Sequence, residues 1–134
     1  DFAVAPDGQR VALIVNDGAT TTLRLGFIDR TTAAPRITGL VRVEQRLTSA
    51  TAVGWLSESE LVVLGAVGAV AVQPIQVTLP LGSVSLLGGP ANPVSLAVAP
   101  GESIIVGDQS GQLWEFTSGR WSASDLGTAP NYVH

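Results

Sequence analysis

A β-hairpin motif occurs three times along this chain and restricts the fold more than any other feature of the sequence. The first copy runs from Phe2 to Val15, where two short apolar strands flank Pro6-Asp7-Gly8. Proline presets one turn dihedral, aspartate caps its own backbone and glycine accepts a positive φ, so this tripeptide favours a tight turn. The second copy turns at Ser57 to Glu60 and the third at Pro100-Gly101. The chain therefore repeats one unit of antiparallel strands.

The spacing of the three turns predicts the architecture. Pro6, Ser57 and Pro100 are separated by roughly fifty and forty residues, the range of propeller blades with four strands each. No stretch shows sustained helical periodicity. We predict an all-β chain, a β-propeller fragment of about three four-stranded antiparallel blades in one segment, residues 1–134, with repeats at approximately 1–48, 49–91 and 92–134. Propellers usually have 4 to 8 blades, so we expect either further blades upstream or an identical partner that completes a six-bladed ring.

Apolar alternation and turn residues predict where the twelve strands lie. An unbroken apolar run, Leu61 to Val72, is interpreted as two buried strands joined by a turn at Gly65 to Gly68. Proline cannot donate to a strand ladder, so Pro74 predicts a bulge or a short break. Residues 30–38 are expected to form a loop and residues 127–134 an irregular tail. The predicted strands are 2–5, 10–15, 22–29 and 40–47 in the first repeat, 51–56, 60–64, 69–78 and 83–87 in the second, and 93–99, 103–107, 112–117 and 121–126 in the third.

Composition sets outer limits on the kind of protein this is. Hydrophobic side chains make up 46% of the chain, enough for a substantial core. Because the chain opens with Asp1 and enters a strand at once, we expect it to be a piece of a longer protein. Cysteine is absent, which excludes a disulfide framework and a thiolate nucleophile. The run from Leu61 to Val72 is only about a dozen residues long, against the ~20 that a membrane-spanning helix requires.

Charge argues against nucleic acid as a partner. Eleven acids outnumber seven bases, for a formal net charge of −4, whereas a nucleic-acid binder normally carries a basic face. Six of the seven bases precede residue 47, and we interpret them as solvated strand and loop positions. The alternative is that they form a basic side that attracts anionic envelope polymers. Neutralising Arg42 and Arg46 would test that alternative. All seven are arginine: Arg10, Arg24, Arg30, Arg36, Arg42, Arg46 and Arg120.

Four aspartates, Asp7, Asp17, Asp108 and Asp125, stand beside or near glycine. A calcium loop gathers several oxygens at close, alternate positions, and none of these turns holds two acids at such spacing. We therefore interpret the aspartates as turn-forming residues and expect no metal site.

The acids and the single histidine do not form a recognisable catalytic pattern. Glu58 and Glu60 are the closest acidic pair and could do acid–base work, but no aromatic or basic residue brackets them as in a sugar cleft. The only histidine is the terminal His134, and the chain has no Gly-x-Ser-x-Gly elbow, P-loop or dinucleotide fingerprint. The predicted inner strands carry almost no ionisable groups. We therefore expect no catalytic or cofactor-binding residues, and a chain that is not an enzyme.

Three tryptophans fall near the repeated turns and are candidates for binding anchors. Large rings in propellers more often wedge between adjacent blades, so Trp55 and Trp114 are interpreted as core. For Trp121, beside Arg120 on an outer strand, the core and surface interpretations both stay open.

The repeats together resemble one bacterial family over essentially the whole chain. Phe2 to Ile14, Val53 to Leu64, Leu113-Trp114 with Trp121, and the ending Gly127 to Tyr132 look like the C-terminal β-propeller of the LpqB family, which are actinobacterial lipoproteins. Pro-Asp-Gly hairpins also recur in TolB-like propellers, so the order of the blades and the ending carry the resemblance more than any single motif.

The resemblance implies an extracytoplasmic, lipid-anchored protein with a GerMN-type domain between the anchor and the propeller, neither of which is in this chain. It further implies an accessory role in MtrAB two-component signalling and cell-envelope homeostasis, through the extracellular region of the sensor histidine kinase. The family offers no catalytic residues to transfer. The alternative is a TolB-like or hydrolase-associated propeller that binds peptide or glycan for a catalytic domain elsewhere, and a homodimer of the fragment is a further expectation.

Overall fold

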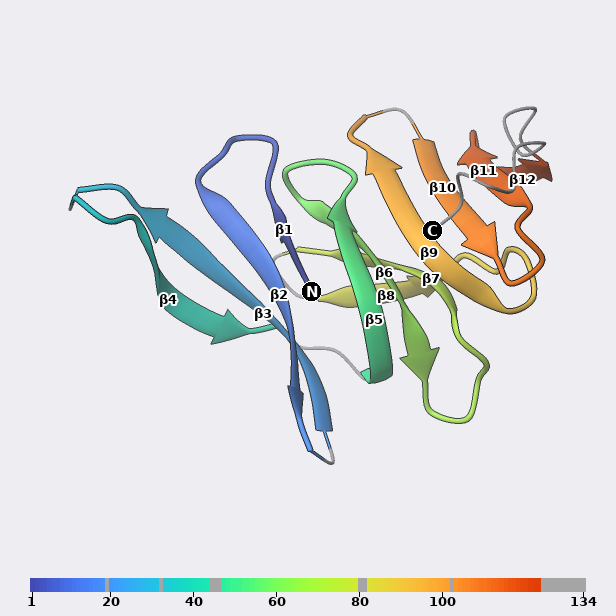
Figure 1. Ribbon diagram of the computed structural model, residues 1–134, viewed down its shortest axis with the longest axis horizontal. Coiled ribbons are helices and arrows are strands. Elements are labelled where there is room, and N and C mark those ends of the chain that lie inside the picture. Colours follow the sequence, from blue (N-terminus) through green and yellow to red (C-terminus); the bar gives the residue numbers. More distant parts are fainter. Residues whose placement is uncertain (19, 32, 44–46, 80–81, 102, 124–134) are drawn as a thin grey trace.

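Twelve strands in three separate sheets make up the computed structural model of the chain (Figure 1). The structure describes residues 1–18, 20–31, 33–43, 47–79, 82–101 and 103–123, and these contain no helix. None of the described residues, accordingly, forms a helix with the length and apolar character needed to cross a membrane. The predicted fold class, an all-β fragment of a propeller with four-stranded antiparallel blades, is confirmed.

Each sheet is a meander in which strands that follow one another in sequence also pair in space. We call the sheets the first, second and third blades. The first contains β1 (Phe2–Val4), β2 (Arg10–Asp17), β3 (Thr20–Asp29) and β4 (Arg36–Arg42); the second β5 (Leu47–Trp55), β6 (Glu60–Val67), β7 (Gln73–Thr78) and β8 (Ser83–Leu86); the third β9 (Pro93–Ala99), β10 (Ser103–Asp108), β11 (Leu113–Thr117) and β12 (Arg120–Ala123).

The turn chemistry of the repeated hairpin operates as the sequence predicts. Gly8 has φ 73° and donates its N–H to the carbonyl of Ala5 at 2.9 Å. The carboxylate of Asp7 accepts the N–H of Gln9 at 2.9 Å, which closes an Asx turn. Gly101 repeats the positive φ, at 75°, in the third blade. These turns lie along the same edge of the molecule, at the top of Figure 1.

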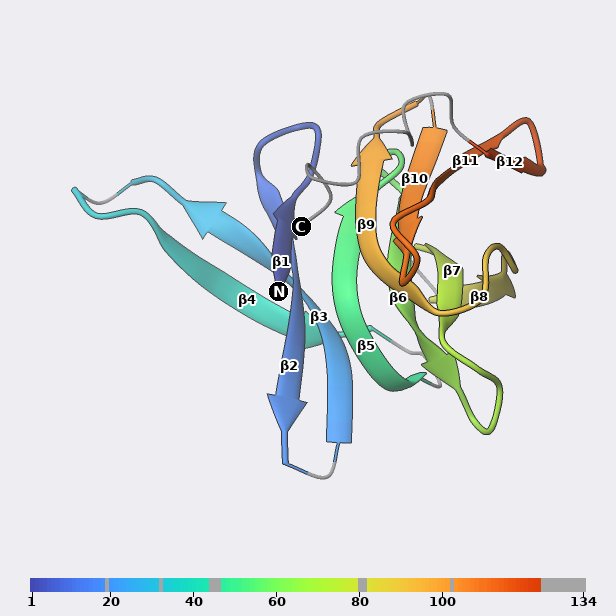
Figure 2. The ribbon, with the colours of Figure 1, turned by 45° about the vertical axis from the view of Figure 1, so that its right-hand side comes forward.

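The blades pack face to face, and β5 lies between β1 and β9 in both views (Figures 1 and 2). Between the first and second blades, small side chains such as Ala3 and Ala12 meet large ones such as Trp55. The Trp55 indole N–H also donates to the carbonyl of Ala3 at 2.9 Å, and the guanidinium of Arg10 lies 4.9 Å from the ring centroid. Trp55 is therefore core, as predicted, and it fastens two blades together.

A second core joins the second and third blades, centred on Val62, Ile104 and Val106. Trp121 packs against this core, with its ring 5.0 Å from that of Phe116, and donates its indole N–H to the carbonyl of Leu87 at 2.8 Å. The interpretation that was open for Trp121 is thus resolved in favour of the core.

Several strand boundaries in the first half of the chain differ from the prediction, most of all those of the fourth and fifth strands. The fourth strand was expected at 40–47 after a loop at 30–38, whereas β4 covers Arg36–Arg42. It starts early because Arg36 pairs with Asp29 across the ladder, where their side chains lie 3.9 Å apart. β5 begins at Leu47 rather than at residue 51, since Leu47 is buried and pairs with Val67.

The predicted turn at Gly65 to Gly68 and the predicted strand from residue 69 are also wrong. β6 continues through Gly65 to Val67, and β7 starts only at Gln73. Gly65 serves close strand contact rather than a turn, because a Cβ there would lie 2.2 Å from the Ser49 carbonyl oxygen. Pro74 causes no break, since it pairs with Leu64 in a continuous register while its carbonyl faces Leu87 just beyond β8. Residues 124–126 of the last predicted strand and the tail at 127–134 lie outside the described residues.

Candidate functional site

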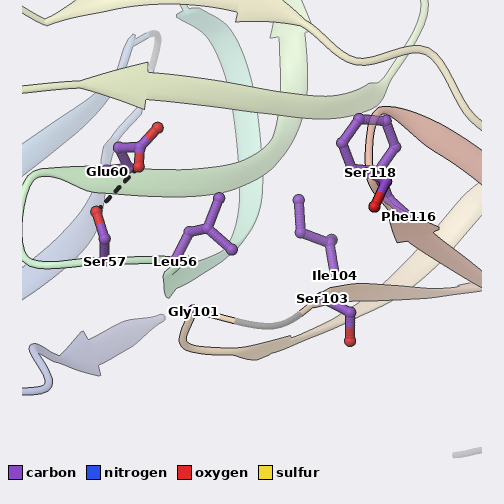
Figure 3. A pocket seen from close by; sticks show the side chains of 8 residues that line it. All are labelled: Leu56, Ser57, Glu60, Gly101, Ser103, Ile104, Phe116 and Ser118. Atoms are coloured by element: carbon purple, nitrogen blue, oxygen red, sulfur yellow. Dashed lines mark hydrogen bonds between the residues drawn. The ribbon is translucent and has the colours of Figure 1, made fainter.

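A pocket and a groove lie at opposite ends of the boundary between the second and third blades. The turn-face pocket, about 280 Å³, opens on the side of the repeated hairpin turns (Figure 3). In Figure 3 the side chains of Leu56 and Ile104 lie between Glu60 on one side and Phe116 on the other. The turn-face pocket is lined by Leu56, Ser57, Glu60, Gly101, Ser103, Ile104, Phe116 and Ser118.

Among the described residues, Glu60 is the only ionisable one that lines the turn-face pocket, and its carboxylate already accepts two hydrogen bonds. One oxygen accepts the Ser57 hydroxyl at 3.1 Å, and the other accepts the side-chain amide of Gln76. The side chain of Glu58 is exposed, while its carbonyl accepts the guanidinium of Arg10. The two acids therefore have different roles. The side chain of Glu60 links β6 to β7 through Gln76, and the backbone carbonyl of Glu58 links the second blade to the first through Arg10. No histidine, cysteine or lysine in the described part of the chain lines the turn-face pocket to act as base or nucleophile beside the serines.

The loop-face groove lies at the other ends of the same strands. It consists of two adjoining hollows of about 570 and 330 Å³ that share Ala71, Val72 and Asn92. Its walls are the β6–β7 loop, the β8–β9 loop and Gln109 of the β10–β11 turn. The full lining is Thr51, Ala71, Val72, Gln73, Gly88, Gly89, Pro90, Ala91, Asn92, Pro93, Val94 and Gln109.

The lining of the loop-face groove is uncharged and mixes apolar surface with amides. Val72 and Val94 expose 38% and 59% of their surface. Thr51, Asn92 and Gln109 supply a hydroxyl and two amide groups within the same hollow. Such a surface offers hydrogen bonds in both directions, together with exposed apolar area, and no charge that would select an ionic ligand.

Local hydrogen bonds hold the walls of the loop-face groove in place. The N–H of Gln109 donates to the carbonyl of Asn92 at 3.0 Å, which links the third blade's turn to the β8–β9 loop. Asn92 itself has φ 53°, a left-handed conformation that asparagine tolerates better than most residues. The N–H of Gly88 donates to the side-chain oxygen of Gln73 at 3.0 Å. These ties hold the groove in one shape before any ligand arrives.

Two of the four glycine-flanked aspartates, Asp7 and Asp108, act in turns. Asp108 accepts the Ser110 hydroxyl at 2.6 Å and the Trp114 indole N–H at 2.9 Å, and these bonds hold its pKa below the ordinary value. The backbone N–H of Gln9 is the main cause of the lowered pKa of Asp7. The side chain of Asp17 and all of Asp125 lie outside the description, as does His134. Among the described side chains, no three acids or histidines come together as a group that could hold a metal ion.

The prediction that Trp114 is core is not confirmed, because the residue lies half-buried and its indole N–H donates to Asp108 within its own hairpin.

The arginines of the first repeat are spread over several settings. Arg10 stacks on Trp55, and Arg36 pairs with Asp29. Arg24 and Arg42 lie opposite each other in the β3–β4 ladder, and neither makes an ion pair with a described residue. Arg46 lies outside the described residues, so the hypothesis of a polymer-binding side at Arg42 and Arg46 stays a prediction. Arg30 and Arg120 are exposed, in agreement with solvated positions.

Sequence reasoning missed the loop-face groove entirely. Its residues belong to three loops from two blades and share no motif, and several are alanine, glycine or proline, which carry no functional chemistry of their own. The one available signal was Gly88-Gly89-Pro90, which marks a loop but not what that loop surrounds.

Comparison with known proteins identifies the family to which the chain belongs. The family model for the lipoprotein LpqB beta-propeller domain matches residues 1–132. A protein named Lipoprotein LpqB from Streptomyces avermitilis is 42% identical over 67 residues, which are 46% of this chain and 11% of the relative. One of the same name from Cutibacterium acnes is 35% identical over 69 residues, 48% of this chain and 12% of the relative. The matched stretches are thus a small part of the length of these relatives.

Proposed function

Because the chain belongs to the family of LpqB lipoprotein beta-propeller domains, we propose that it is a non-enzymatic interaction module of an extracytoplasmic, lipid-anchored protein. In this proposal it is an accessory to MtrAB-type two-component signalling and cell-envelope homeostasis, and its partner is the extracellular region of the sensor histidine kinase. The names of the relatives support the lipoprotein setting. The partner follows from the resemblance described above.

The observation that carries the interaction role is the loop-face groove. Its uncharged lining suits an extended peptide segment, because Thr51, Asn92 and Gln109 offer donors and acceptors to a peptide backbone while Val72 and Val94 offer apolar contact. Its walls are already tied together by hydrogen bonds, so binding would cost little ordering of the loops.

A non-enzymatic role is supported by the chemistry of the turn-face pocket. General acid–base work requires a carboxyl group free to exchange protons with a substrate. Both carboxylate oxygens of Glu60 instead accept hydrogen bonds from Ser57 and Gln76. The pocket serves better as a structural seam between blades than as a reaction site.

The alternative, a TolB-like or hydrolase-associated propeller that binds peptide or glycan for a catalytic domain elsewhere, would use the same groove. None of the described residues places an aromatic ring in the lining of the loop-face groove, whereas sugar rings are commonly held by stacking on aromatic faces. The lining therefore favours a peptide over a glycan as the ligand, whether the chain is a signalling accessory or a hydrolase-associated propeller.

The test is capture of the purified extracellular region of the sensor kinase by the immobilised chain. We expect the wild-type chain to retain it and a Val72→Asp, Val94→Asp variant to lose it, because two carboxylates would be placed in an uncharged groove. The matched control is Val41→Asp, at a valine that is 64% exposed and outside the groove. Equal capture by the groove variant and the control would refute the assignment of the site, and no capture by the wild-type chain would refute the partner.

A further inference from the structure

The β3–β4 ribbon, residues 27–42, projects beyond the other strands of the chain. β3 has 10 residues and β4 has 7, whereas the third and fourth strands have 6 and 4 residues in the second blade and 5 and 4 in the third. In both views the ends of β3 and β4 that meet at their connecting turn lie toward the left margin, away from the second and third blades (Figures 1 and 2). Arg30 and each described residue from Thr31 to Gly39 are exposed. The ribbon is therefore open to a partner.

Two large apolar side chains of the ribbon, Phe27 and Val41, are exposed on the side of the second blade. Val41 pairs with Leu25, which packs against the core between the first and second blades. Phe27 pairs with Arg10, whose guanidinium stacks on Trp55 of the second blade. Directly paired residues share a face of the sheet, so Phe27 and Val41 face the side that the second blade occupies. They nevertheless expose 57% and 64% of their surface, because they lie beyond the reach of its shorter outer strands.

The same ribbon carries positive charge in a chain that is otherwise strongly acidic. Residues 27–42 contain three arginines and one acid, whereas the rest of the sequence contains four arginines and ten acids. Arg30 and Arg36 flank a turn, residues 31–35, that has no charged residue. The side chain of Arg36 is 68% exposed, although its Nε lies 3.9 Å from a carboxylate oxygen of Asp29, the one acid. An anionic surface would attract the ribbon and repel the remainder, which fixes the side of the molecule that meets it.

The backbone of the ribbon disfavours a partner that would add a strand. β4 is the outer strand of its sheet, but the β3–β4 register shifts between Leu25 and Phe27. On the opposite strand Gly39 has φ 64°, and a Cβ there would lie 3.7 Å from the ring of Phe27. Such a bulge twists the outer strand and breaks the regular row of hydrogen-bonding groups that a further strand needs. The surface therefore suits a partner that it contacts through side chains.

We propose that the β3–β4 ribbon docks on an anionic lipid bilayer. The uncharged turn and the face with Phe27 and Val41 lie against the bilayer, where apolar side chains enter the boundary between headgroups and acyl chains. Arg30 and Arg36 bind phosphate oxygens of the headgroups, which guanidinium groups match with paired hydrogen bonds. The apolar side chains distinguish a bilayer from a soluble polyanion, which offers no apolar phase to receive them. This inference goes beyond the proposed function and depends on neither the kinase nor the loop-face groove.

Cosedimentation of the complete chain with lipid vesicles tests the docking. Vesicles of phosphatidylglycerol and phosphatidylcholine in about equal amounts are compared with vesicles of phosphatidylcholine alone. We expect the chain to bind only the anionic vesicles, and to bind them less at about 0.5 M than at about 0.1 M NaCl, because salt screens the arginines. Circular dichroism of every variant verifies that the blades remain folded.

Substitutions in the ribbon should weaken the binding through both of its parts. Arg30→Gln and Arg36→Gln should each lower the partition coefficient for anionic vesicles roughly fivefold, because each removes one charge from the membrane surface. The double variant Phe27→Ser, Val41→Ser should lower it by about tenfold or more, because the bilayer no longer buries that apolar surface.

Matched controls make the same kinds of change away from the ribbon. Arg120→Gln removes an exposed arginine of β12, and Leu86→Ser removes a leucine of β8 that is 47% exposed. Both controls should bind as the wild-type chain does. Equal losses of binding in Arg36→Gln and Arg120→Gln would assign the binding to net charge rather than to the ribbon, and would overturn the proposal.

Two further outcomes would also overturn it. A wild-type chain that fails to bind anionic vesicles, or that binds neutral ones equally well, does not recognise an anionic bilayer through this ribbon. Binding that is undiminished in the Phe27→Ser, Val41→Ser variant, and that soluble dextran sulfate competes away, is recognition of polyanions by charge alone.

Discussion

The close contact between Gly54 and Val98 allows a prediction about how the second and third blades are held together. Gly54→Ala should destabilise the chain, because the new methyl group would lie 2.5 Å from one carbon of Val98 and 3.0 Å from another. Overfilling a packed core costs typically about 1–3 kcal/mol. Against this, replacing glycine by alanine in an ordinary strand conformation gains about 0.4–1 kcal/mol through the unfolded state. We expect a net loss of about 1–2 kcal/mol.

The second substitution separates steric overlap from other causes. Val98→Ala alone should cost at most about 1.6 kcal/mol, the value for two fully buried carbon groups at about 0.8 kcal/mol each, because Val98 is only partly buried. In the Val98→Ala background, Gly54→Ala should cost much less, because the 2.5 Å overlap with a methyl carbon is gone and only the 3.0 Å contact with Cβ, which alanine keeps, remains. The two substitutions should therefore couple favourably by about 1–2 kcal/mol, within the range measured for residues in contact.

Urea unfolding followed by tryptophan fluorescence gives the four free energies of this cycle, since Trp55 and Trp121 both lie in the cores between blades. Gly65→Ala is the matched control. Its new methyl would meet the Ser49 carbonyl within the second blade, so Val98→Ala should give it no relief. If Gly54→Ala is as destabilising with alanine at position 98 as with valine, overlap with the Val98 side chain is not the reason that position 54 requires glycine.

Three further substitutions test other parts of the structure. Trp55→Phe should lower the free energy of unfolding by about 1–2 kcal/mol, because it removes the bond to the Ala3 carbonyl and weakens the stacking of Arg10; an unchanged urea midpoint would contradict this role. Trp121→Phe should cost about 0.5–1.5 kcal/mol by the same assay, since the carbonyl of Leu87 loses its donor. The pKa of Asp108 is lowered in the folded chain, so the ionised carboxylate stabilises the fold. This stabilisation is fully present above pH 3.8, the ordinary pKa of aspartate, and is lost as the pH falls from 3.8 through the folded-state pKa. Asp108→Asn should therefore flatten the decline of the thermal midpoint below pH 3.8, and an unchanged slope would show that Asp108 does not contribute to it.

The sequence predicted those parts of the fold that depend on local chemistry. The turn at Pro6-Asp7-Gly8 and the strand 93–99 needed only turn residues and alternation, and both are present. The prediction failed where a contact distant in sequence decides the outcome. Gly65 looked like a turn residue, yet its role is set by the Ser49 carbonyl of the neighbouring strand. Pro74 looked like a break, but it lies where its missing N–H faces the region beyond the end of β8.

The candidate site was less predictable than the fold. The acids that drew attention in the sequence, Glu58 and Glu60, serve blade-to-blade and strand-to-strand contacts. The loop-face groove depends on how Asn92 and Gln109, from two separate loops, are brought together by the packing of blades. Nothing in either loop by itself indicates a shared surface, so only the three-dimensional arrangement identifies it.

Recognition of the kinase by these blades is tested most directly by the affinity of the complete extracytoplasmic lipoprotein for the sensor region of the kinase, with and without residues 1–134. We expect the deletion to abolish binding while circular dichroism shows the remainder still folded. Undiminished affinity after the deletion would contradict it, and would assign recognition to other domains of the lipoprotein.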